Sequence, residues 1–266
     1  MRGWMQVRIS GRSCWWFEGE NPLQNRYAAD IGDFVKLSML RHLAPGSKLG
    51  VLWWLYPDED HNADGKHVAY LDRPQLWRAL DPALFDQLKL IVRSNVRNVA
   101  ALQQADLFDD AIYHNIIIPT AGDAKTRKAC RLEWFNQATC LLEKCNLVFL
   151  DPDNGLETKN YSAGSARAGK SVALAELKAL RRTNRTIVVY HHHTRMAGGN
   201  IVELAHWGDR LAELGFRVDA LRAAVGTARA FFLLDATPEL QERAAHFARR
   251  WGDKVTWHPA LGGGKP

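Results

Sequence analysis

The chain has 266 residues, of which 47% are hydrophobic, so it is long enough to form one large domain with a substantial core. Its net charge of +6 favours an anionic partner, such as a nucleic acid or a phosphorylated small molecule. The four cysteines form no Cys-x-x-Cys pair, which excludes a zinc ribbon, and no apolar run approaches the roughly 20 residues that span a bilayer.

The first residues of the chain show no clear period, and the arginines at positions 2, 8 and 12 interrupt any apolar run there, unlike in a signal peptide. We therefore expect a cytoplasmic protein with no membrane partner. We expect residues 1–24 to form an N-terminal arm, residues 25–260 to form a single α/β domain, and residues 261–266 to form a flexible tail.

Strand-like and helix-like segments alternate from residue 32 onward. In the first helix, apolar side chains recur at helical spacing, as Phe34, Leu37, Leu40 and Leu43. The expected strands cover residues 47–57, 67–72, 111–120, 146–151, 186–193, 216–223 and 228–236. The expected helices cover residues 32–43, 73–80, 82–93, 98–108, 125–144, 171–182, 203–215 and 238–251.

This alternation predicts a Rossmann-like three-layer α/β sandwich, in which a mostly parallel sheet carries helices on both faces. The strands at 146–151 and 186–193 are almost wholly apolar, as is typical of central parallel strands. The last two strands are joined only by a short turn at Gly226, so they must pair antiparallel at the C-terminal edge.

The apolar strand at 146–151 ends in the sequence Asp-Pro-Asp-Asn-Gly. Burying an unpaired carboxylate costs several kcal/mol, so Asp151 and Asp153 are expected where the strand meets water or a ligand. Ligands of such sheets bind outside the carboxyl ends of the strands. We therefore assign catalytic roles to Asp151, Asp153 and Asn154.

The next apolar strand ends in Tyr-His-His-His-Thr-Arg. Strand alternation places His191 and His193 on one face and His192 on the other. We expect His191 and His193 to share the cleft with Asp151 and to move protons near neutral pH. Arg195 is expected to bind substrate or phosphate. The alternative is that the three histidines form a solvated strand end.

Two further groups complete the predicted site. Asp30, Asp33 and Lys36 surround the start of the first helix, and Lys36 lies one turn after Asp33, so the three are expected to bind a cofactor at the cleft rim. The alternative for Asp33 is an N-terminal cap or a first-turn carboxylate of that helix. Lys170 lies in a glycine-containing loop and is expected to reach a phosphate group.

These motifs resemble two groups of proteins. The elements Gly-Asp-Phe-x-Lys, Asp-Pro-Asp-Asn-Gly-Leu and His-x-x-Arg resemble an uncharacterised bacterial family. The Asp-Pro pair and the segment at 26–43 also resemble class I methyltransferases that act on exocyclic amines of bases, such as the ribosomal RNA large-subunit methyltransferase J family. The resemblance implies a methyltransferase-like fold, S-adenosylmethionine as cofactor and a nucleic acid or nucleotide as substrate.

In that family Asp151 would accept a hydrogen bond from the amine of the base. Such enzymes have a glycine-rich turn after the first strand, whereas this chain has the acidic segment 58–66, which is better suited to a hydroxylated ligand or to a cation such as Mg²⁺ or Mn²⁺. The Asp-x-Asp pattern also resembles the nucleophile motif of haloacid dehalogenase-type phosphatases, with Gly155 where that family prefers Thr or Val.

Two other functions stay open. The first is a metal-dependent nuclease or phosphohydrolase, with Asp151, Asp153, His191 and His193 as ligands of a cation that activates water. The second is a non-catalytic nucleic-acid-binding module on a degenerate methyltransferase fold, for which the basic character of the chain would suffice.

Overall fold

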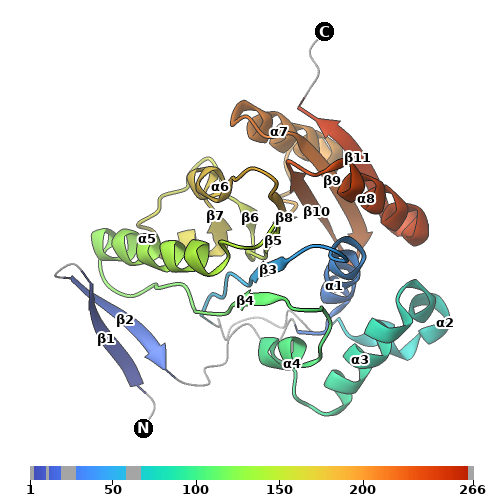
Figure 1. The fold of residues 1–266 in the computed structure, drawn as a ribbon, viewed down its shortest axis with the longest axis horizontal. Coiled ribbons are helices and arrows are strands. Elements are labelled where there is room, and N and C mark those ends of the chain that lie inside the picture. Colours follow the sequence, from blue (N-terminus) through green and yellow to red (C-terminus); the bar gives the residue numbers. More distant parts are fainter. Residues whose placement is uncertain (1–2, 10–11, 19–27, 58–66, 263–266) are drawn as a thin grey trace.

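A computed structural model describes residues 3–9, 12–18, 28–57 and 67–262 of the chain (Figure 1). Parts of the expected arm, the acidic segment 58–66 and most of the expected tail lie outside the described residues. The helices are α1 (Ile31–Leu43), α2 (Pro74–Trp77), α3 (Pro82–Arg93), α4 (Val99–Gln104), α5 (Ala124–Leu141), α6 (Leu174–Leu180), α7 (Gly199–Glu213) and α8 (Pro238–Trp251).

In the described part of the chain the strands form three sheets, of which the largest has seven strands in the order β11-β9-β10-β8-β5-β3-β4. Its members are β3 (Leu49–Leu52), β4 (Ile112–His114), β5 (Leu147–Leu150), β8 (Thr186–His192), β9 (Val218–Val225), β10 (Thr227–Leu234) and β11 (Val255–Leu261). Strands β4, β3, β5 and β8 pair parallel, whereas β10 pairs antiparallel with both β8 and β9, and β11 pairs antiparallel with β9.

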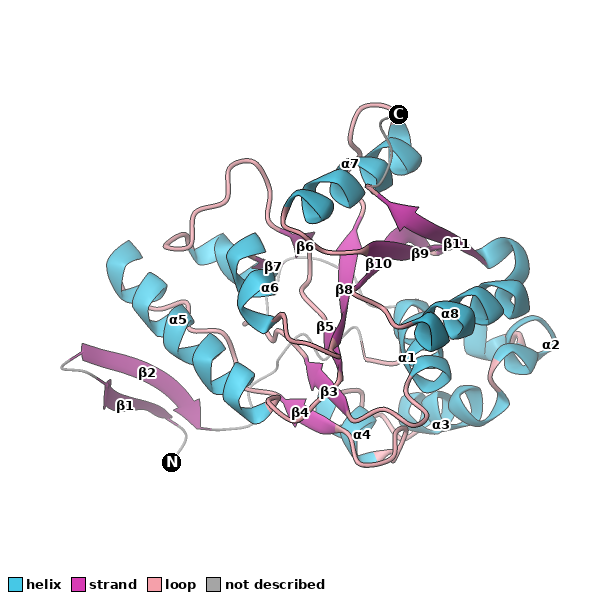
Figure 2. Ribbon diagram, turned by 45° about the horizontal axis from the view of Figure 1, so that its top comes forward, coloured by secondary structure: helices cyan, strands magenta, loops and turns pink. Residues whose placement is uncertain are grey.

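Helices pack against both faces of this sheet (Figure 2). The alternation along β5 separates two cores: Leu147 and Phe149 face α1, α3 and α8, whereas Val148 and Leu150 face α5, α6 and α7. The expected α/β class, the mostly parallel sheet and the antiparallel C-terminal strand pair are therefore confirmed. Within the described residues, no helix is both long and apolar enough to cross a membrane.

The sequence-based elements agree with most of the described helices and strands, and one difference has a clear cause. Residues 67–72 were expected to form a strand, but Ala69–Asp72 form a short 3-10 helix. Tyr70 stacks on Phe34 with ring centroids 5.4 Å apart, and its hydroxyl donates to the backbone oxygen of Ala29. This tertiary packing decides a segment that is too short for its pattern to distinguish helix from strand.

The sequence analysis did not predict one single strand and two strand pairs. Strand β11 contains a proline, which an edge strand tolerates because one side of it needs no partner. Two short strands, β6 (Gly155–Leu156) and β7 (Ser171–Val172), pair parallel with each other. In the N-terminal arm, β1 (Gly3–Ile9) and β2 (Arg12–Glu18) form an antiparallel hairpin sheet of their own.

Candidate active site

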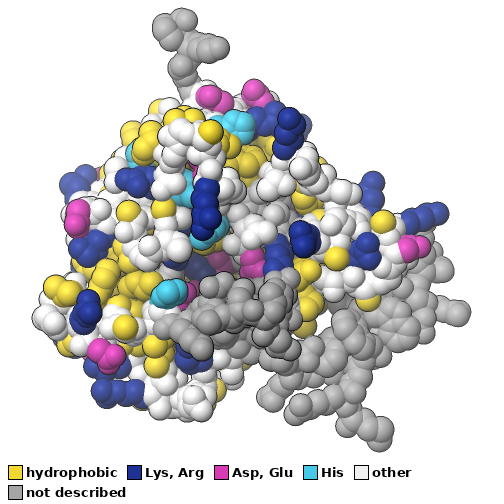
Figure 3. Space-filling model, turned by 180° about the vertical axis from the view of Figure 1, so that it is seen from behind, with side chains coloured by type: hydrophobic (Ala, Val, Ile, Leu, Met, Phe, Trp, Pro, Cys, Tyr) yellow, Lys and Arg dark blue, Asp and Glu magenta, His cyan; other side chains and the backbone are white. Residues whose placement is uncertain are grey.

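A cavity of about 560 Å³ lies at the carboxyl ends of β3, β5 and β8, on the side of the sheet that α1 covers. The residues that follow these three strands line it, together with the first turn of α1, two side chains of α4, and the turn between β9 and β10. Figure 3 shows this face of the molecule, where acidic side chains lie in a hollow with lysine, arginine and histidine side chains around it. The cavity therefore occupies the position expected for a ligand site in an open α/β sheet.

Lys36 is the centre of the cavity floor. Its Nζ lies 2.7 Å from Oδ2 of Asp151 and 2.8 Å from Oδ1 of Asp33, and all three side chains are at most 13% exposed. The same ammonium lies 6.0 Å from the ring centroid of Trp53 and 5.9 Å from that of Tyr190. Helix α1 and strand β5 are thus joined by a buried charge network across the floor of the cavity.

This network sets the ionisation of the buried groups. Burial raises the pKa of Asp151 to about 6, although the nearby Lys36 acts against the rise. Burial alone would lower the pKa of Lys36, but the two carboxylates outweigh it and hold the pKa above its ordinary value. Lys36 is therefore a fixed cation, whereas Asp151 changes its charge close to neutral pH.

The start of α1 explains why Asp30 and Asp33 lie where they do. Oδ1 of Asp30 accepts a hydrogen bond from the backbone nitrogen of Asp33 at 2.9 Å, so Asp30 caps the helix. Oδ2 of Asp33 accepts from the backbone nitrogen of Ala29, while Oδ1 binds Lys36. Asp30 is therefore the N-terminal cap, whereas Asp33 is a first-turn carboxylate, as the alternative for it allowed, and both residues line the cavity.

Close packing against Arg229 explains the glycine at position 32, the first residue of the Gly-Asp-Phe-x-Lys motif. A Cβ atom at this position would lie 1.9 Å from Nη1 of Arg229, so only glycine lets that guanidinium approach α1. Arg229 is buried, and it donates to backbone and side-chain oxygens of Thr227. Arg229 lines the cavity from β10, and the sequence analysis missed it.

The segment after β5 brings Asp151, Asp153 and Asn154 to the cavity, as expected. The backbone nitrogen of Asn154 donates to the carbonyl oxygen of Lys170 at 2.9 Å, which ties this segment to the loop before β7. The Nζ of Lys170 lies over the ring of Tyr56, 4.9 Å from its centroid. Lys170 therefore also lines the cavity, at the side where Tyr56 follows β3.

The expected placement of two histidines is wrong. His191 and His193 do not line the cavity, because they point to the opposite face of β8, toward α7. Strand alternation instead directs Tyr190 and His192 into the cavity, together with the following Arg195. The alternation was visible in the sequence, but nothing in the sequence showed which of the two faces is the open one.

Tyr190 and His192 form a pair on the cavity wall. The hydroxyl oxygen of Tyr190 and Nδ1 of His192 lie 3.3 Å apart. Burial lowers the pKa of His192, and the positive charge of Arg229 lowers it further. Burial raises the pKa of Tyr190 to about 12. At neutral pH, His192 is therefore an uncharged imidazole that can accept a proton inside the cavity.

His191 and His193 instead bind one buried carboxylate, that of Glu203 on α7. His191 Nε2 lies 3.2 Å from Oε1 of Glu203, and His193 Nδ1 lies 3.2 Å from Oε2. The backbone nitrogen and the hydroxyl of Thr194 donate to the same carboxylate. Burial alone would raise the pKa of Glu203, but the hydrogen bonds from His191 and Thr194 outweigh it and lower the pKa to about 2.

The acidic side chains of the cavity do not gather as a metal site. Among the described residues, His191, His193 and Glu203 are the one group of three or more potential ligands whose ligand atoms lie within 4.8 Å of one another. Asp151 and Asp33 are joined instead by the ammonium of Lys36. The expected four-residue ligand set of Asp151, Asp153, His191 and His193 is therefore split between two faces of the sheet.

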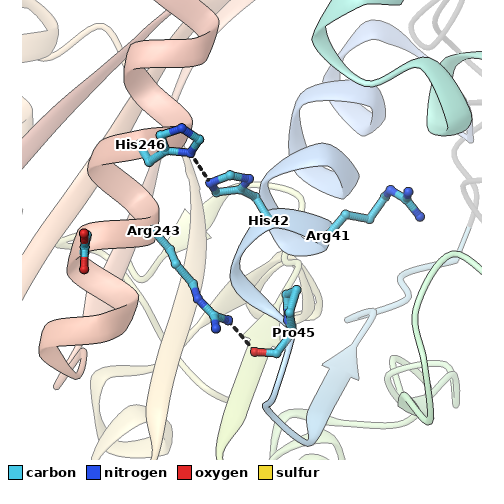
Figure 4. Close-up of a pocket in the computed structure, with 6 residues that line it drawn as sticks. Arg41, His42, Pro45, Arg243 and His246 are labelled. Carbon is cyan, nitrogen blue, oxygen red and sulfur yellow. Dashed lines mark hydrogen bonds between the residues drawn. The ribbon is translucent and has the colours of Figure 1, made fainter.

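A second, more open hollow lies between α1 and α8, away from this cavity (Figure 4). His246 Nδ1 lies 3.0 Å from His42 Nε2, and the rings stack at 5.0 Å. Arg243 donates to the carbonyl oxygens of Leu43 and Pro45. These groups bind one another across the two helices, so their contacts hold the C-terminal end of α1 against α8.

Comparisons with known proteins add no family to this description. No protein-family model matches the chain, and no curated protein matches it. The chemistry of the site is therefore argued from its own residues.

Proposed function

We propose that the chain is a methyltransferase-like enzyme that acts on a nucleic acid or nucleotide, with the cavity as the site of the reacting base. The observation that carries the proposal is Asp151: a buried carboxylate at the end of the central strand β5, held by Lys36 and facing a cavity lined by aromatic and basic side chains. A carboxylate in such a place suits the recognition of an exocyclic amine.

The sheet supports this class. The antiparallel strand β10 lies between β8 and β9, so a core of parallel strands is followed along the chain by an antiparallel pair. The methyltransferase resemblance of the sequence implies this arrangement, and the cavity lies at the strand ends where the same resemblance places the reaction.

Asp151 would orient the nucleophile. Its Oδ2 binds Lys36, and within the described part of the chain its Oδ1 accepts no hydrogen bond from the protein, so Oδ1 is left for the amine of the base. The lone pair of such an amine is delocalised into the ring, and an acceptor that fixes the N–H directions aids its attack. The ionised form of Asp151, favoured above its pKa of about 6, is the form in which Oδ1 carries no proton and can accept an N–H of the amine.

His192 would take the proton that the amine loses once it carries the methyl group. It lies on the wall of the cavity beside Tyr190, and its lowered pKa keeps it unprotonated at neutral pH. Arg195 and Lys170, at the edge of the cavity, would neutralise phosphate groups of the substrate. This assignment moves the expected proton-transfer role from His191 and His193 to His192.

The donor set also fits S-adenosylmethionine in its chemistry. Carboxylates and aromatic faces suit a cationic sulfonium compound with ribose hydroxyls, and Asp30 and Trp53 supply both on the α1 side of the cavity. When bound, this cofactor supplies an electrophilic methyl group. One feature departs from the family pattern: β3 is followed by Trp53, Trp54, Leu55 and Tyr56 instead of a glycine-rich turn.

The metal-dependent hydrolase is the weaker alternative. The ammonium of Lys36 already occupies the position between Asp33 and Asp151 that a divalent cation would need. Its two proposed histidine ligands bind Glu203 on the other face of β8. A hydrolase of this kind would have to displace a fixed cation before it could bind Mg²⁺ or Mn²⁺.

Calorimetry with matched nucleotides tests the proposal. AMP carries an exocyclic amine, whereas IMP has an oxygen at the same position, so we expect AMP to bind at least tenfold more tightly because only its amine donates to Asp151. The preference should disappear in Asp151→Ala. Transfer of a labelled methyl group from S-adenosylmethionine to an adenine-containing RNA oligonucleotide tests the reaction itself.

The outcomes separate the three functions. Equal affinity for AMP and IMP would contradict the role of Asp151 in base recognition. Metal-dependent cleavage of the oligonucleotide, lost in Asp153→Asn, would favour the hydrolase. Binding of RNA that is unchanged in Asp151→Ala, without any methyl transfer, would favour a non-catalytic binding module.

A further inference from the structure

We propose that Glu203 is a positioning residue that holds both polar loops of the cavity in place from the opposite face of the sheet. The inference rests on the proposed function, because the residues it positions include the base-binding Asp151 segment and the proton acceptor His192. It assigns a task to His191 and His193, which the mechanism itself does not use.

The first loop that Glu203 holds is the end of β8. The carboxylate of Glu203 is fully buried. It accepts hydrogen bonds from His191, from His193, and from both the backbone nitrogen and the hydroxyl of Thr194. Successive residues of a strand point to opposite faces. Because Glu203 holds the side chains of His191 and His193 toward α7, the side chain of His192 must point into the cavity.

The same carboxylate also holds the chain where it turns away from β8. Arg195 has a left-handed φ of 63°, a conformation that is unfavourable for a residue with a Cβ atom. Thr194, the preceding residue, is tied to Glu203 by three contacts of 2.7 to 3.0 Å. These contacts stabilise the turn that brings Arg195 to the cavity.

The second loop is the segment after β5. The backbone nitrogen of Leu156 donates to Nδ1 of His191 at 3.2 Å. The neighbouring Gly155 has a φ of 92°, and a Cβ atom there would lie 2.5 Å from the Cα of His191. His191 thus links Glu203 to Gly155 and Leu156, which directly follow the Asp151–Asn154 segment, so Glu203 holds the end of this segment through His191.

The hydrogen-bond pattern favours a proton network over a bound metal. Since Nδ1 of His191 accepts from Leu156, the proton of this imidazole lies on Nε2, the nitrogen that faces Glu203. A nitrogen that carries a proton cannot bind a metal. A metal bound to Nε2 of His191 would move the proton of the imidazole to Nδ1. Nδ1 could then no longer accept the hydrogen bond from the backbone nitrogen of Leu156.

Hydrogen exchange tests the two tethers without any assumption about activity. In Glu203→Gln, the new amide cannot accept all the donors around it, so residues 155–157 and 191–195 should exchange at least tenfold faster than in the wild type. Glu213→Gln is the matched control: it is the same substitution on the same helix, at an exposed side chain paired only with Arg210 among the described residues.

A double-mutant cycle tests whether Glu203 acts through His192. Provided that the wild type transfers methyl groups, Glu203→Gln should lower kcat/KM at least tenfold, but less than twofold in the His192→Gln background. Thr194→Val, which removes one hydrogen bond and keeps the carboxylate, provides a milder variant if Glu203→Gln folds poorly. It should show the same dependence on His192 with a smaller effect.

Each outcome bears on a different claim. A wild type that neither binds AMP nor transfers a methyl group would refute the proposed function, whereas the exchange experiment would still decide whether Glu203 holds the loops. Unchanged exchange in both loops, or effects of Glu203→Gln and His192→Gln that simply add, would overturn the positioning role. So would one equivalent of metal that purifies with the wild type and is lost in Glu203→Gln.

Discussion

Replacement of Lys36 by methionine should be one of the most damaging single changes in the cavity. At an effective dielectric constant of 20, contacts of 2.7 and 2.8 Å each give about 6 kcal/mol of attraction between Lys36 and the carboxylates of Asp151 and Asp33. Much of this attraction offsets the desolvation of three buried charges. Lys36→Met keeps the volume but leaves two buried carboxylates close together, so we expect a loss of about 3–5 kcal/mol in the free energy of unfolding at pH 8.

The stability deficit of Lys36→Met should depend on pH, and the pKa of Asp151 determines the direction of that dependence. Burial already raises the pKa of Asp151 to about 6, above its model-peptide value of 3.8, and loss of Lys36 would raise it further. A carboxyl group with a raised pKa takes up protons in the folded state first, so the deficit should shrink as the pH falls from 8 to 5.

Urea unfolding followed by circular dichroism measures both effects. Lys254→Met, at an exposed ion pair with Asp253, is the control, and should cost no more than about 1 kcal/mol. A deficit under 1 kcal/mol for Lys36→Met at pH 8, or one that grows on acidification, would refute the buried charge network.

Three further predictions follow from the site. The rate of methyl transfer should rise with pH through an apparent pKa of about 6, because Asp151 must lose its proton before its free oxygen can accept an N–H group; a rate that is flat between pH 5 and 8 would contradict this role. Gly155→Ala should lower the free energy of unfolding by more than 2 kcal/mol, since it combines a left-handed backbone with a clash against His191, whereas Gly46→Ala, with a similar φ and open space, should lose only about 1 kcal/mol in urea unfolding. Arg195→Ala should weaken binding of RNA oligonucleotides of any sequence and reduce the slope of log affinity against log salt concentration by about 1; an unchanged salt slope would exclude a phosphate contact.

Local patterns were sufficient to predict most of the fold. The expected helices at 82–93 and 238–251 coincide with α3 and α8, because each begins with a proline and carries a continuous apolar stripe. The antiparallel pair of β9 and β10 followed from the short connection at Gly226, which has a φ of 66°. Register, strand order and the edge strand β11 depend on contacts far apart in the chain, and no local pattern encodes them.

The site was predictable to the extent that it follows strand ends. Asp151, Asp153 and Asn154 lie in the cavity because the chain must leave the sheet there. His192 was missed for a different reason: alternation separates it from its two neighbours, but only the packing of α7 against one face of β8 shows which face is closed. Likewise, nothing before position 203 or after it marks Glu203 as different from the exposed acidic residues of the same helix.

The buried cation narrows the chemistry of the cavity. A site built to hold Mg²⁺ would expose several carboxylate oxygens without a fixed positive charge between them, because the metal itself neutralises them. Here the ammonium of Lys36 lies between Asp33 and Asp151 and offsets one of their two negative charges, so a divalent ion is not the group that holds these carboxylates together. What the site leaves accessible is one oxygen of a carboxylate that ionises near neutral pH, beside an uncharged imidazole. That combination can bind an N–H group and remove its proton, and it is better suited to the modification of an amine than to the activation of water by a metal.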